Sequence, residues 1–316
     1  MAADTPGDAQ RGEPHADRVR RVDRAVALAI ERPERLLCVV GPTASGKTDL
    51  AIEVCARVDG EIISADSVQV YRGFDLGSGK PTPAERARAP HHVIDALEPL
   101  ETADAMTYAR LAEAAIADVR ARGRVPVLCG GTFFWVRALV LGLAPAPPAD
   151  EAIRARHRAL VDERGRAALH DQLARVDPVS AARLHPNDTL RVSRALEVHE
   201  LSGRTMSEHH AEHGFRSPRM ESVMVGVTAT PEELTERITR RVDGWLAEGW
   251  IDEVRALITS GYSEARAMGS VGYAEVHQHV QGALPREALR DAIVQSTRIF
   301  ARKQRTWLKS AQVEWL

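Results

Sequence analysis

Short apolar runs alternate with helix-like segments along most of the chain. Four of these runs, at residues 36–40, 61–64, 125–129 and 222–227, have the length of buried β-strands. Apolar residues at helical spacing occupy 49–58 and about 103–122, between the first three runs. Because parallel strands need crossover helices that cover both faces of the sheet, this alternation predicts an α/β fold with a parallel sheet flanked by helices.

The alternation stops at residues 143–148, which read LAPAPP. From 150 to about 207 the pattern is helical and contains no strand-like run, so we predict an inserted all-helical domain at 143–214. Helical spacing returns after Pro231, in the segments 231–248, 250–260, 271–281 and 285–310. The expected organisation is an N-terminal extension, an α/β core, the insertion and a mainly helical return to the core, at 1–35, 36–142, 143–214 and 215–316.

The N-terminal extension contains no apolar run that resembles a signal peptide, and no later stretch reaches the roughly 18 apolar residues of a membrane span. Residues 1–15 are polar and rich in turn formers, which predicts disorder, and 16–32 reads as a charged helix. The three cysteines are odd in number and far apart, and two of them lie inside apolar runs, which argues against a disulfide framework or a cysteine-based zinc site, so we expect a reducing compartment and a cytoplasmic protein. They are Cys38, Cys55 and Cys129.

Charge is balanced over the whole chain but not along it. The 42 Lys and Arg residues oppose 44 Asp and Glu residues, and the net charge of −2 excludes a strongly basic, unspecific nucleic-acid binder. Residues 297–316 carry five basic and one acidic side chain, whereas residues 36–150 carry 11 basic and 14 acidic ones. Such segregation suits contact with a nucleic-acid backbone on one face.

The segment GPTASGKT at 41–48 matches the phosphate-binding pattern G-x-x-x-x-G-K-[ST] between a predicted strand and a predicted helix. Its glycines let the backbone curl so that successive N–H groups and the helix N-terminus face one anion. The lysine adds a mobile cation, and the hydroxyl of Thr48 is a candidate ligand of Mg²⁺. The expected phosphate-binding residues are Gly41, Thr43, Ala44, Ser45, Gly46, Lys47 and Thr48.

A phosphate loop does not by itself say what happens to the phosphate. A kinase would ordinarily place an acidic residue at the end of a second strand to hold Mg²⁺, but the run 125–129 ends in Gly130-Gly131. The carboxylate nearest to a strand end is Asp66, in the segment SADSVQVY. From the residues alone, Asp66 is either a metal ligand in a kinase or a proton acceptor in a transferase.

Several segments together resemble one family, the tRNA dimethylallyltransferases. The matching segments cover the chain from about residue 36 nearly to its end, and their order and spacing fit the family. They are GPTASGKT (41–48), SADSVQVYRGFDLGSGKP (64–81), PHHVIDALEP (90–99), VLCGGT (127–132), RLHPNDTLRVSRALEVHELSGRT (183–205), RITRRVDGWLAEGWIDEVRAL (237–257), SVGYAEV (270–276) and TRIFARKQRTWLK (297–309).

The resemblance implies a P-loop NTPase-like sheet with an inserted helical domain, and a monomeric, Mg²⁺-dependent prenyltransferase. The family transfers a dimethylallyl group from dimethylallyl diphosphate to N6 of the adenosine at tRNA position 37, next to the anticodon. The resemblance puts Arg241 at the diphosphate, makes Asp66 the base that takes the N6 proton, and gives Thr132 a hydrogen bond near the same amine. Arg237, one helical turn before Arg241, is interpreted as an ordinary solvated residue.

The tRNA contacts implied by the resemblance fall into three groups. Asp66, Ser67, Val68, Gln69 and Thr132 are expected around the extracted base, since chemistry on a base requires taking it out of its stack. The insertion, which we expect to grip the anticodon arm, contributes Arg154, Arg191 and Arg194. The C-terminal third contributes Gly272, Tyr273 and the run Arg302, Lys303, Gln304, Arg305 with Trp307.

Some positions depart from the family pattern or stay unassigned. Trp135 stands where the family usually has a tyrosine, Ser78 replaces a threonine, and Ala274 follows Gly272-Tyr273 where a basic residue is common. The pair His91-His92 is expected to be structural and near the site. The cluster of His209, His210 and His213 with Glu212 is interpreted as a solvated loop rather than a metal site.

Three other functions compete with tRNA modification. A free-nucleotide isopentenyltransferase would share the core, but the insertion favours a larger RNA substrate. A small-molecule kinase would use ATP in the same loop. A non-catalytic RNA-binding protein would have no need for both Lys47 and Asp66.

Overall fold

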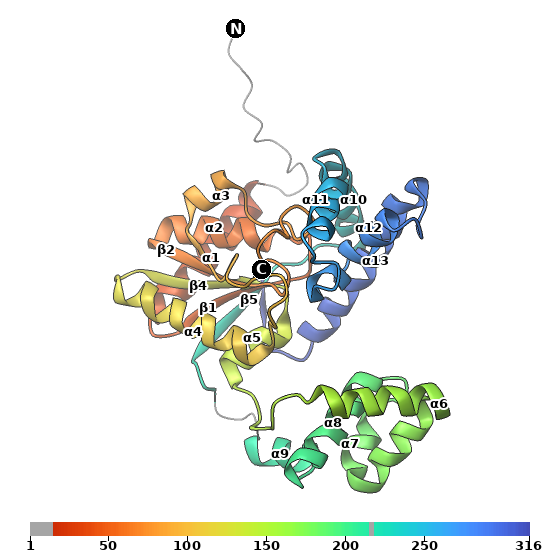
Figure 1. Cartoon of the computed structure of the whole chain (residues 1–316). Coiled ribbons are helices and arrows are strands. Elements are labelled where there is room, and N and C mark those ends of the chain that lie inside the picture. Colours follow the sequence, from red (N-terminus) through yellow and green to blue (C-terminus); the bar gives the residue numbers. More distant parts are fainter. Residues whose placement is uncertain (1–14, 215–217) are drawn as a thin grey trace. The chain divides into compact units, whose positions relative to one another are not determined.

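The computed structural model of the 316-residue chain describes residues 15–214 and 218–316, which form two compact units (Figure 1). The first unit joins residues 1–140 to residues 220–316, and the second comprises 141–219. The second unit therefore begins two residues before and ends five residues after the insertion expected at 143–214. Each unit has its own buried apolar cluster and is described by itself.

Unit 1 contains a six-stranded sheet in the order β3-β2-β4-β1-β5-β6, and every paired strand is parallel to its neighbour. The predicted fold class, a parallel α/β sheet flanked by helices, is confirmed. Helices α2 (Lys47–Val58) and α4 (Ala105–Ala121) lie on opposite sides of the sheet (Figure 1). The strands are β1 (Leu36–Val40), β2 (Gly60–Ala65), β3 (His91–His92), β4 (Val125–Gly130), β5 (Ser222–Gly226) and β6 (Glu314–Trp315).

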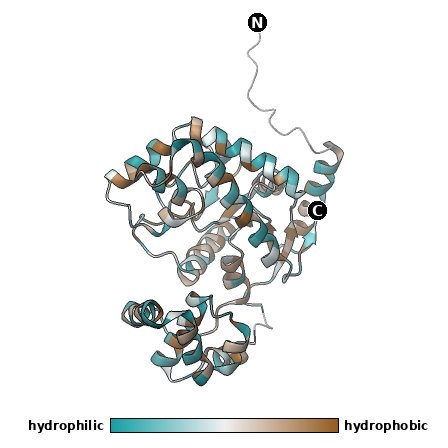
Figure 2. Ribbon diagram, turned by 90° about the vertical axis from the view of Figure 1, so that its right-hand side faces the viewer, coloured by the Kyte–Doolittle hydropathy of each residue, from teal (hydrophilic) through white to brown (hydrophobic). Residues whose placement is uncertain are grey.

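The helices of unit 1 alternate hydrophilic and hydrophobic residues along their length (Figure 2), as expected where one face packs on a sheet and the other meets solvent. Among the described residues, no helix is long and apolar enough to cross a membrane. These helices are α1 (His15–Glu31), α2 (Lys47–Val58), α3 (Pro83–Arg88), α4 (Ala105–Ala121), α5 (Phe133–Leu141), α10 (Pro231–Ala247), α11 (Trp250–Thr259), the 3₁₀ helix η1 (Arg266–Gly269), α12 (Tyr273–Val280) and α13 (Arg286–Leu308).

The expected N-terminal extension is not separate from the core. Helix α1 buries Val22, Ala25 and Ala29 in the same apolar cluster as strand β1 and helix α2. A charged helix with three small or branched apolar residues on one face gains stability by covering the sheet, because each buried side chain leaves water. The disorder expected for residues 1–15 concerns residues that lie almost wholly outside the described part of the chain.

Unit 2 is all-helical in its described part, as predicted for the insertion. Its helices are α6 (Glu151–Val176), α7 (Pro178–Arg183), α8 (Thr189–Ser202) and α9 (Met206–His213). Leu169 and Leu173 of α6 pack against Val192, Ala195 and Leu196 of α8. This apolar cluster is small, so the polar groups buried beside it have a strong effect on the stability of the unit.

The histidine segment differs from its prediction as a solvated loop. It forms helix α9, whose capping box joins Thr205 and Glu208, and His209 is buried within unit 2. Glu212 pairs with Arg204 at the surface. Over residues 15–214 and 218–316, no cluster of three or more His, Cys, Asp or Glu residues could hold a metal ion.

Candidate functional site

The phosphate loop connects β1 to α2 at the carboxyl edge of the sheet, as predicted. Ala44 and Gly46 adopt positive φ angles of 63° and 94°, which turns the backbone N–H groups of the loop toward one side. Helix α2 has no side-chain cap at Gly46, whereas Asp104 caps α4 and Thr230 caps α10. The first N–H groups of α2 therefore keep their capacity to bind an anion.

Two side chains of the phosphate loop, those of Lys47 and Ser45, are also suited to bind an anion. Lys47 is half-buried, its Nζ lies 3.4 Å from the Pro42 carbonyl oxygen, and the loss of solvent around it lowers the pKa of its ammonium group. The Ser45 hydroxyl is buried and has no hydrogen-bond partner among the described residues. A buried hydroxyl without a partner is costly, so a phosphate oxygen at this position would satisfy it.

Arg241 of α10 and Arg237, one turn earlier, approach the loop from outside it. Arg241 lines the same pocket as Lys47 and lies over the Trp245 ring, with its guanidinium carbon 5.4 Å from the ring centre. Arg237 donates to the carbonyl oxygens of Ala44 and Ser45, at 3.5 and 3.3 Å. The structure therefore gives Arg237 a role in holding the loop, where the sequence predicted only a solvated residue.

Asp66 follows β2 and faces the same pocket. Its Oδ1 accepts hydrogen bonds from the backbone N–H groups of Val68 and Gln69, at 2.9 and 3.2 Å. These bonds fix the carboxylate by closing a turn, which is the local structural role that aspartate often has after a strand. The two hydrogen bonds of the turn use only Oδ1. Asp66 is therefore held in a fixed position while it lines the pocket.

Thr132 follows the end of β4 and lies beside the Asp66 turn. Its Oγ1 accepts from the Ser67 N–H at 3.1 Å, and its own N–H donates to the Ala65 carbonyl at 3.1 Å. Neighbouring parallel strands end at the same edge of a sheet, and this places the β2 and β4 turns together next to the phosphate loop.

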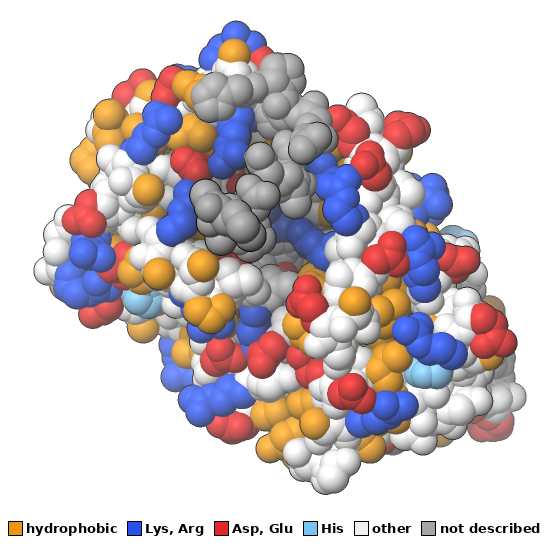
Figure 3. Space-filling model, turned by 90° about the horizontal axis from the view of Figure 1, so that it is seen from above, with side chains coloured by type: hydrophobic (Ala, Val, Ile, Leu, Met, Phe, Trp, Pro, Cys, Tyr) orange, Lys and Arg blue, Asp and Glu red, His pale blue; other side chains and the backbone are white. Residues whose placement is uncertain are grey.

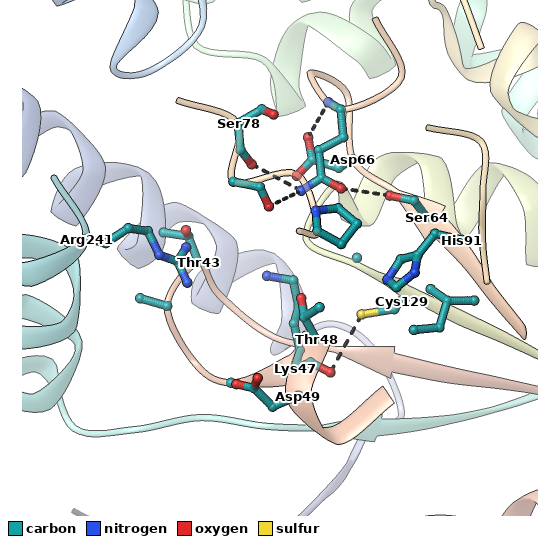
Figure 4. Close-up of a pocket in the computed structure, with 17 residues that line it drawn as sticks. Thr43, Lys47, Thr48, Asp49, Ser64, Asp66, Ser78, His91, Cys129 and Arg241 are labelled. Carbon is teal, nitrogen blue, oxygen red and sulfur yellow. Dashed lines mark hydrogen bonds between the residues drawn. The ribbon is translucent and has the colours of Figure 1, made fainter. Parts of the chain in front are cut away.

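The pocket brings together most of the catalytic residues predicted from the sequence. Arg241 and His91 lie toward opposite ends of the cavity drawn in Figure 4, with Lys47 between them. The wall of the pocket also includes Thr43, Ala44, Gly46, Thr48, Asp66 and Gln69.

Three side chains in the wall offer oxygen atoms that could bind a metal ion: the Thr48 hydroxyl and the carboxylates of Asp66 and Asp49. Mg²⁺ prefers oxygen ligands and usually keeps several waters, so a few donors beside a phosphate site fit it better than a complete protein cage would.

His91 and Cys129 line the pocket without a role assigned to them from the sequence, although His91 was expected near the site. His91 lines the pocket, its Nδ1 lies 2.7 Å from the Ala89 carbonyl oxygen, and burial lowers the pKa of its ring. Cys129 also lines the pocket, and burial raises the pKa of its thiol to about 11, which keeps it protonated at neutral pH. Their sequence signal was that both lie inside segments that match the family, His91 in PHHVIDALEP and Cys129 in VLCGGT.

Gln69 and Ser78 hold the pocket wall together. The Gln69 side-chain amide donates to the carbonyl oxygens of Ser78 and Gly79, at 3.1 and 3.0 Å, and its oxygen lies 3.1 Å from the Ser64 hydroxyl. Ser78 keeps the hydroxyl of the family's threonine and donates to the Phe74 carbonyl at 2.7 Å. Trp135, the other departure, is buried and stacks on Tyr108 at a ring distance of 4.5 Å.

Two side chains that were expected to contact tRNA are buried in the structure. Tyr273 is fully buried between the Phe74 and Trp250 rings, and its hydroxyl donates to Glu253 at 2.6 Å. Gln304 is also buried, because its side chain turns toward the phosphate loop. Gly272 begins α12 with a positive φ of 89° and is buried against Trp250, so it shapes the core rather than a surface.

The arginines expected to contact tRNA from unit 2 are engaged with carboxylates. Glu197 is fully buried, and Arg154 binds it with two hydrogen bonds of 2.9 and 3.2 Å. Arg194 pairs with the same carboxylate at 2.5 Å and donates to the Pro147 carbonyl at 2.6 Å. Arg191 is exposed and pairs with Asp188 at the start of α8. Only Arg191 of the three presents a largely exposed side chain.

On α13, Arg302 and Lys303 are exposed and Arg305 is partly exposed, as their predicted role requires. Trp307 is 45% exposed. On the face drawn in Figure 3, Lys and Arg side chains are interspersed with Asp and Glu side chains. The basic residues of α13 occur in a chain whose total charge is nearly balanced.

Comparisons with known proteins agree with this geometry. Residues 69–311 match the family described as IPP transferase, and residues 34–95 match the one described as isopentenyl transferase. The tRNA dimethylallyltransferase of Sorangium cellulosum is 62% identical over 289 residues, which are 92% of each chain. The relative of the same name from Geobacter sulfurreducens is 41% identical, over 89% of this chain and 91% of its own.

A solved structure of a tRNA isopentenylpyrophosphate transferase from Bacillus halodurans is also similar. It superimposes with a TM-score of 0.66 at 37% identity, over 90% of this chain and 89% of its own. The two family matches together cover all the residues that line the pocket, and the relatives are covered nearly end to end. This chain belongs to the IPP transferase family.

Proposed function

We propose that this chain transfers the dimethylallyl group of dimethylallyl diphosphate to N6 of the adenosine at position 37 of tRNA. The bond between the allylic carbon and the diphosphate oxygen breaks, a bond from N6 to that carbon forms, and one N6 proton leaves. The observation that carries the proposal is the pocket that joins the phosphate loop, Arg241 and Asp66 in a member of this family.

Negative charge grows on the diphosphate as the C–O bond breaks, and the loop side of the pocket is suited to stabilise it. The N–H groups at the start of α2 are fixed in direction before the reaction, so they need no reorganisation. Lys47 and Arg241 add two cations that line the same cavity. Lys47 contacts the Pro42 carbonyl and Arg241 contacts the Trp245 ring. The Asp49 carboxylate attracts both cations, but neither forms a salt bridge with it in the described part of the chain, so their charges remain available to an anion.

The opposite wall is suited to the nucleophile. The exocyclic amine of adenine is a weak nucleophile because its lone pair is delocalised, so a carboxylate that takes its proton helps the bond to form. Asp66 has this role in the proposal, and Thr132 holds the turn beside it by accepting from the Ser67 N–H. An adenine inside a helical stack cannot reach such a cavity, which is why we expect the base to be extracted.

A bound Mg²⁺ would neutralise part of the diphosphate charge as the leaving group departs. The Thr48 hydroxyl at the start of α2 is the protein group best suited to hold it. The protein's own part is to present that hydroxyl beside the N–H groups and Lys47.

For the RNA, the exposed basic side chains are the best candidates for phosphate contacts: Arg191 of unit 2 and Arg302, Lys303 and Arg305 of α13. We propose that the insertion serves the anticodon arm, that the enzyme acts as a monomer, and that it works in the cytoplasm, where its tRNA substrate is found. Dimethylallyl diphosphate and tRNA would then be its two partners.

The test is transfer of labelled dimethylallyl diphosphate to three acceptors: an anticodon stem-loop with adenosine at position 37, free AMP, and the same stem-loop with guanosine there. Label in the adenosine stem-loop alone supports the proposal. Label only in AMP would make the chain a free-nucleotide isopentenyltransferase. A parallel reaction with labelled ATP and small acceptors tests the kinase, and phosphate transfer without prenyl transfer would overturn the proposal.

A further inference from the structure

Gln304 occupies an unusual place on helix α13. It lies on the buried face of the helix between Ala301 and Leu308, while Arg302 and Lys303 beside it in sequence are exposed. Burying a primary amide is costly unless both its oxygen and its nitrogen find hydrogen-bond partners. A leucine or alanine would cover the same apolar face without this requirement.

Both ends of the Gln304 amide are used, each by a different part of the pocket. Its Oε1 accepts from the Thr43 N–H at 2.8 Å, and its Nε2 donates to the Gly131 carbonyl at 3.0 Å. The partners fix the orientation, because turning the amide over would set N–H against N–H and oxygen against oxygen. A glutamate lacks the donor, and an aliphatic side chain lacks both groups.

The two backbone partners belong to the two halves of the reaction centre. Thr43 is part of the phosphate loop, and the hydrogen bond from its N–H to Gln304 holds the loop in place. Gly131 directly precedes Thr132, whose hydroxyl and N–H bind the turn that carries Asp66. A single side chain thus joins the diphosphate side to the nucleophile side.

The approach leaves little room for a side chain at position 131 while Gln304 keeps its place. A Cβ atom on Gly131 would lie 2.5 Å from the Gln304 nitrogen, nearer than real carbon atoms come. Glycine at position 131 therefore lets the helix bring its amide to the carbonyl. The arrangement depends on contact between segments that are 261 and 173 residues apart.

We propose that Gln304 is a positioning residue of the transfer reaction, which sets the distance between the phosphate loop and the Thr132 turn. The proposal rests on the proposed function and deepens it. Gln304 acts through backbone groups and does not itself touch either substrate. Small displacements of reacting groups are expensive, since about 1 Å of misplacement can cost about 100-fold in rate.

The first experiment compares Gln304→Leu with Gln295→Leu, an exposed glutamine of the same helix. Gln304→Leu should lower kcat about 10–100-fold and weaken the affinity for inorganic diphosphate, while KM for the anticodon stem-loop changes little. Gln295→Leu should match the wild type in all three. If Gln304→Leu keeps the wild-type kcat, or raises only KM for the stem-loop, the proposal is wrong, and in the second case Gln304 contacts RNA.

A second variant covers the possibility that Gln304→Leu does not fold. Gln304→Glu keeps the acceptor for Thr43, but its ionised carboxylate repels the Gly131 carbonyl, and protonation restores the donor. Its kcat relative to the wild type at the same pH should therefore rise as pH falls. A ratio that stays constant over the range where both proteins are folded would contradict the proposal.

The two proposals can fail separately. If the wild type transfers no label to the stem-loop, the proposed function fails, but diphosphate affinity still reports on the loop. Weaker diphosphate binding by Gln304→Leu than by Gln295→Leu would then keep the positioning role, and equal binding would end it. If the wild type transfers label and both variants do so equally well, only the positioning role is lost.

Discussion

The charged groups around the phosphate loop differ from those of unit 2 in what they contact. Lys47 and Arg241 meet a backbone carbonyl and an aromatic ring, and Asp66 accepts from backbone N–H groups. In unit 2, Arg154 and Arg194 close on the buried carboxylate of Glu197. Both regions carry arginine on helices, and sequence spacing alone does not separate them.

This difference indicates which charged side chains are available to bind a ligand. A cation that lines a cavity and touches only neutral groups keeps its electrostatic attraction for an anion that enters. A cation paired with a buried carboxylate has its charge neutralised. Removing the cation leaves the carboxylate unpaired in the protein interior, where an unpaired charge is costly. The pairing of each charge, more than its residue type, separates chemistry from architecture.

The largest effect is expected at Asp66, where the comparison predicts loss of rate without loss of structure. Asp66→Asn keeps an oxygen for the Val68 and Gln69 N–H groups but cannot take a proton, so transfer should slow by about 10²–10⁴-fold. Single-turnover transfer and the affinity for inorganic diphosphate should be measured together. A near-normal rate in Asp66→Asn would mean that the residue serves only the turn.

Removing a pocket cation should reduce activity nearly as much. Arg241→Gln should lower transfer about 10²–10³-fold, the cost of losing one group that stabilises developing negative charge, with little change in the unfolding midpoint. The matched control is Arg240→Gln, the preceding residue of α10, which pairs with Glu236 at the surface. Equal losses in both variants would remove the special status of Arg241.

Glu61 is a buried carboxylate of unit 1 that is paired with basic residues, as Glu197 is in unit 2. A variant at Glu61 therefore tests whether such a paired charge contributes to stability in both units. Hydrogen bonds from Arg122, His92 and Arg124 outweigh burial and lower the pKa of Glu61 from its usual 4.5 to about 2. A carboxylate whose pKa is lower in the folded state stabilises the fold above pH 4.5 and loses this effect as pH falls toward 2.

Glu61→Gln should therefore lower the free energy of unfolding by about 3 kcal/mol at neutral pH, as the shift in pKa implies. The difference from the wild type should shrink as the pH falls from 4.5 to 2, and urea unfolding at several pH values measures it. A difference that does not depend on pH would mean that the carboxylate charge adds nothing.

In unit 2, the pairing of Arg154 with Glu197 predicts that replacing Arg154 lowers stability, whereas the family resemblance predicts that it weakens RNA binding. Burial raises the pKa of Glu197, but hydrogen bonds from Arg154 and Arg194 outweigh it and lower the pKa overall. Arg154→Met should cost about 1–3 kcal/mol because part of this buried carboxylate loses its partner. Hydrogen exchange of the α8 amides in the whole chain would report it.

Arg191→Met is the matched control on α8, because Arg191 is exposed at the surface. It should weaken stem-loop binding and leave exchange unchanged. If instead Arg154→Met weakens RNA binding and leaves exchange unchanged, Arg154 is an RNA contact and the contrast between the two regions is lost.

The smallest effect belongs to the exposed cations of α13. Lys303→Ala should weaken stem-loop binding only a few-fold and reduce the slope of log affinity against log salt by about 1. Arg298→Ala, also exposed on α13, is the control for a general loss of positive charge. Equal slopes for the two variants would show that Lys303 makes no particular phosphate contact.

Much of the architecture follows from local patterns. The strands at 36–40, 125–130 and 222–226 and the helices α2, α4 and α10 lie within a few residues of their predicted bounds, because apolar period and glycine loops act over short distances. Helix α5, which follows β4, was not predicted. The two-residue strands β3 and β6 were not predicted, since two residues carry no period. The anion-binding character of the loop 41–48 was also readable, because its pattern of eight consecutive residues is local.

The sequence alone therefore determined the α/β sheet, the helical insertion, the phosphate loop and the family. Only the tertiary structure decided which polar side chains face each other: Gln304 with the phosphate loop, Arg154 and Arg194 with Glu197, and Tyr273 with Glu253. These contacts join residues far apart along the chain, and the same arginine or glutamine suits a surface, a ligand site or a buried pair. What it does depends on the partner that folding brings to it, and no local pattern encodes that partner.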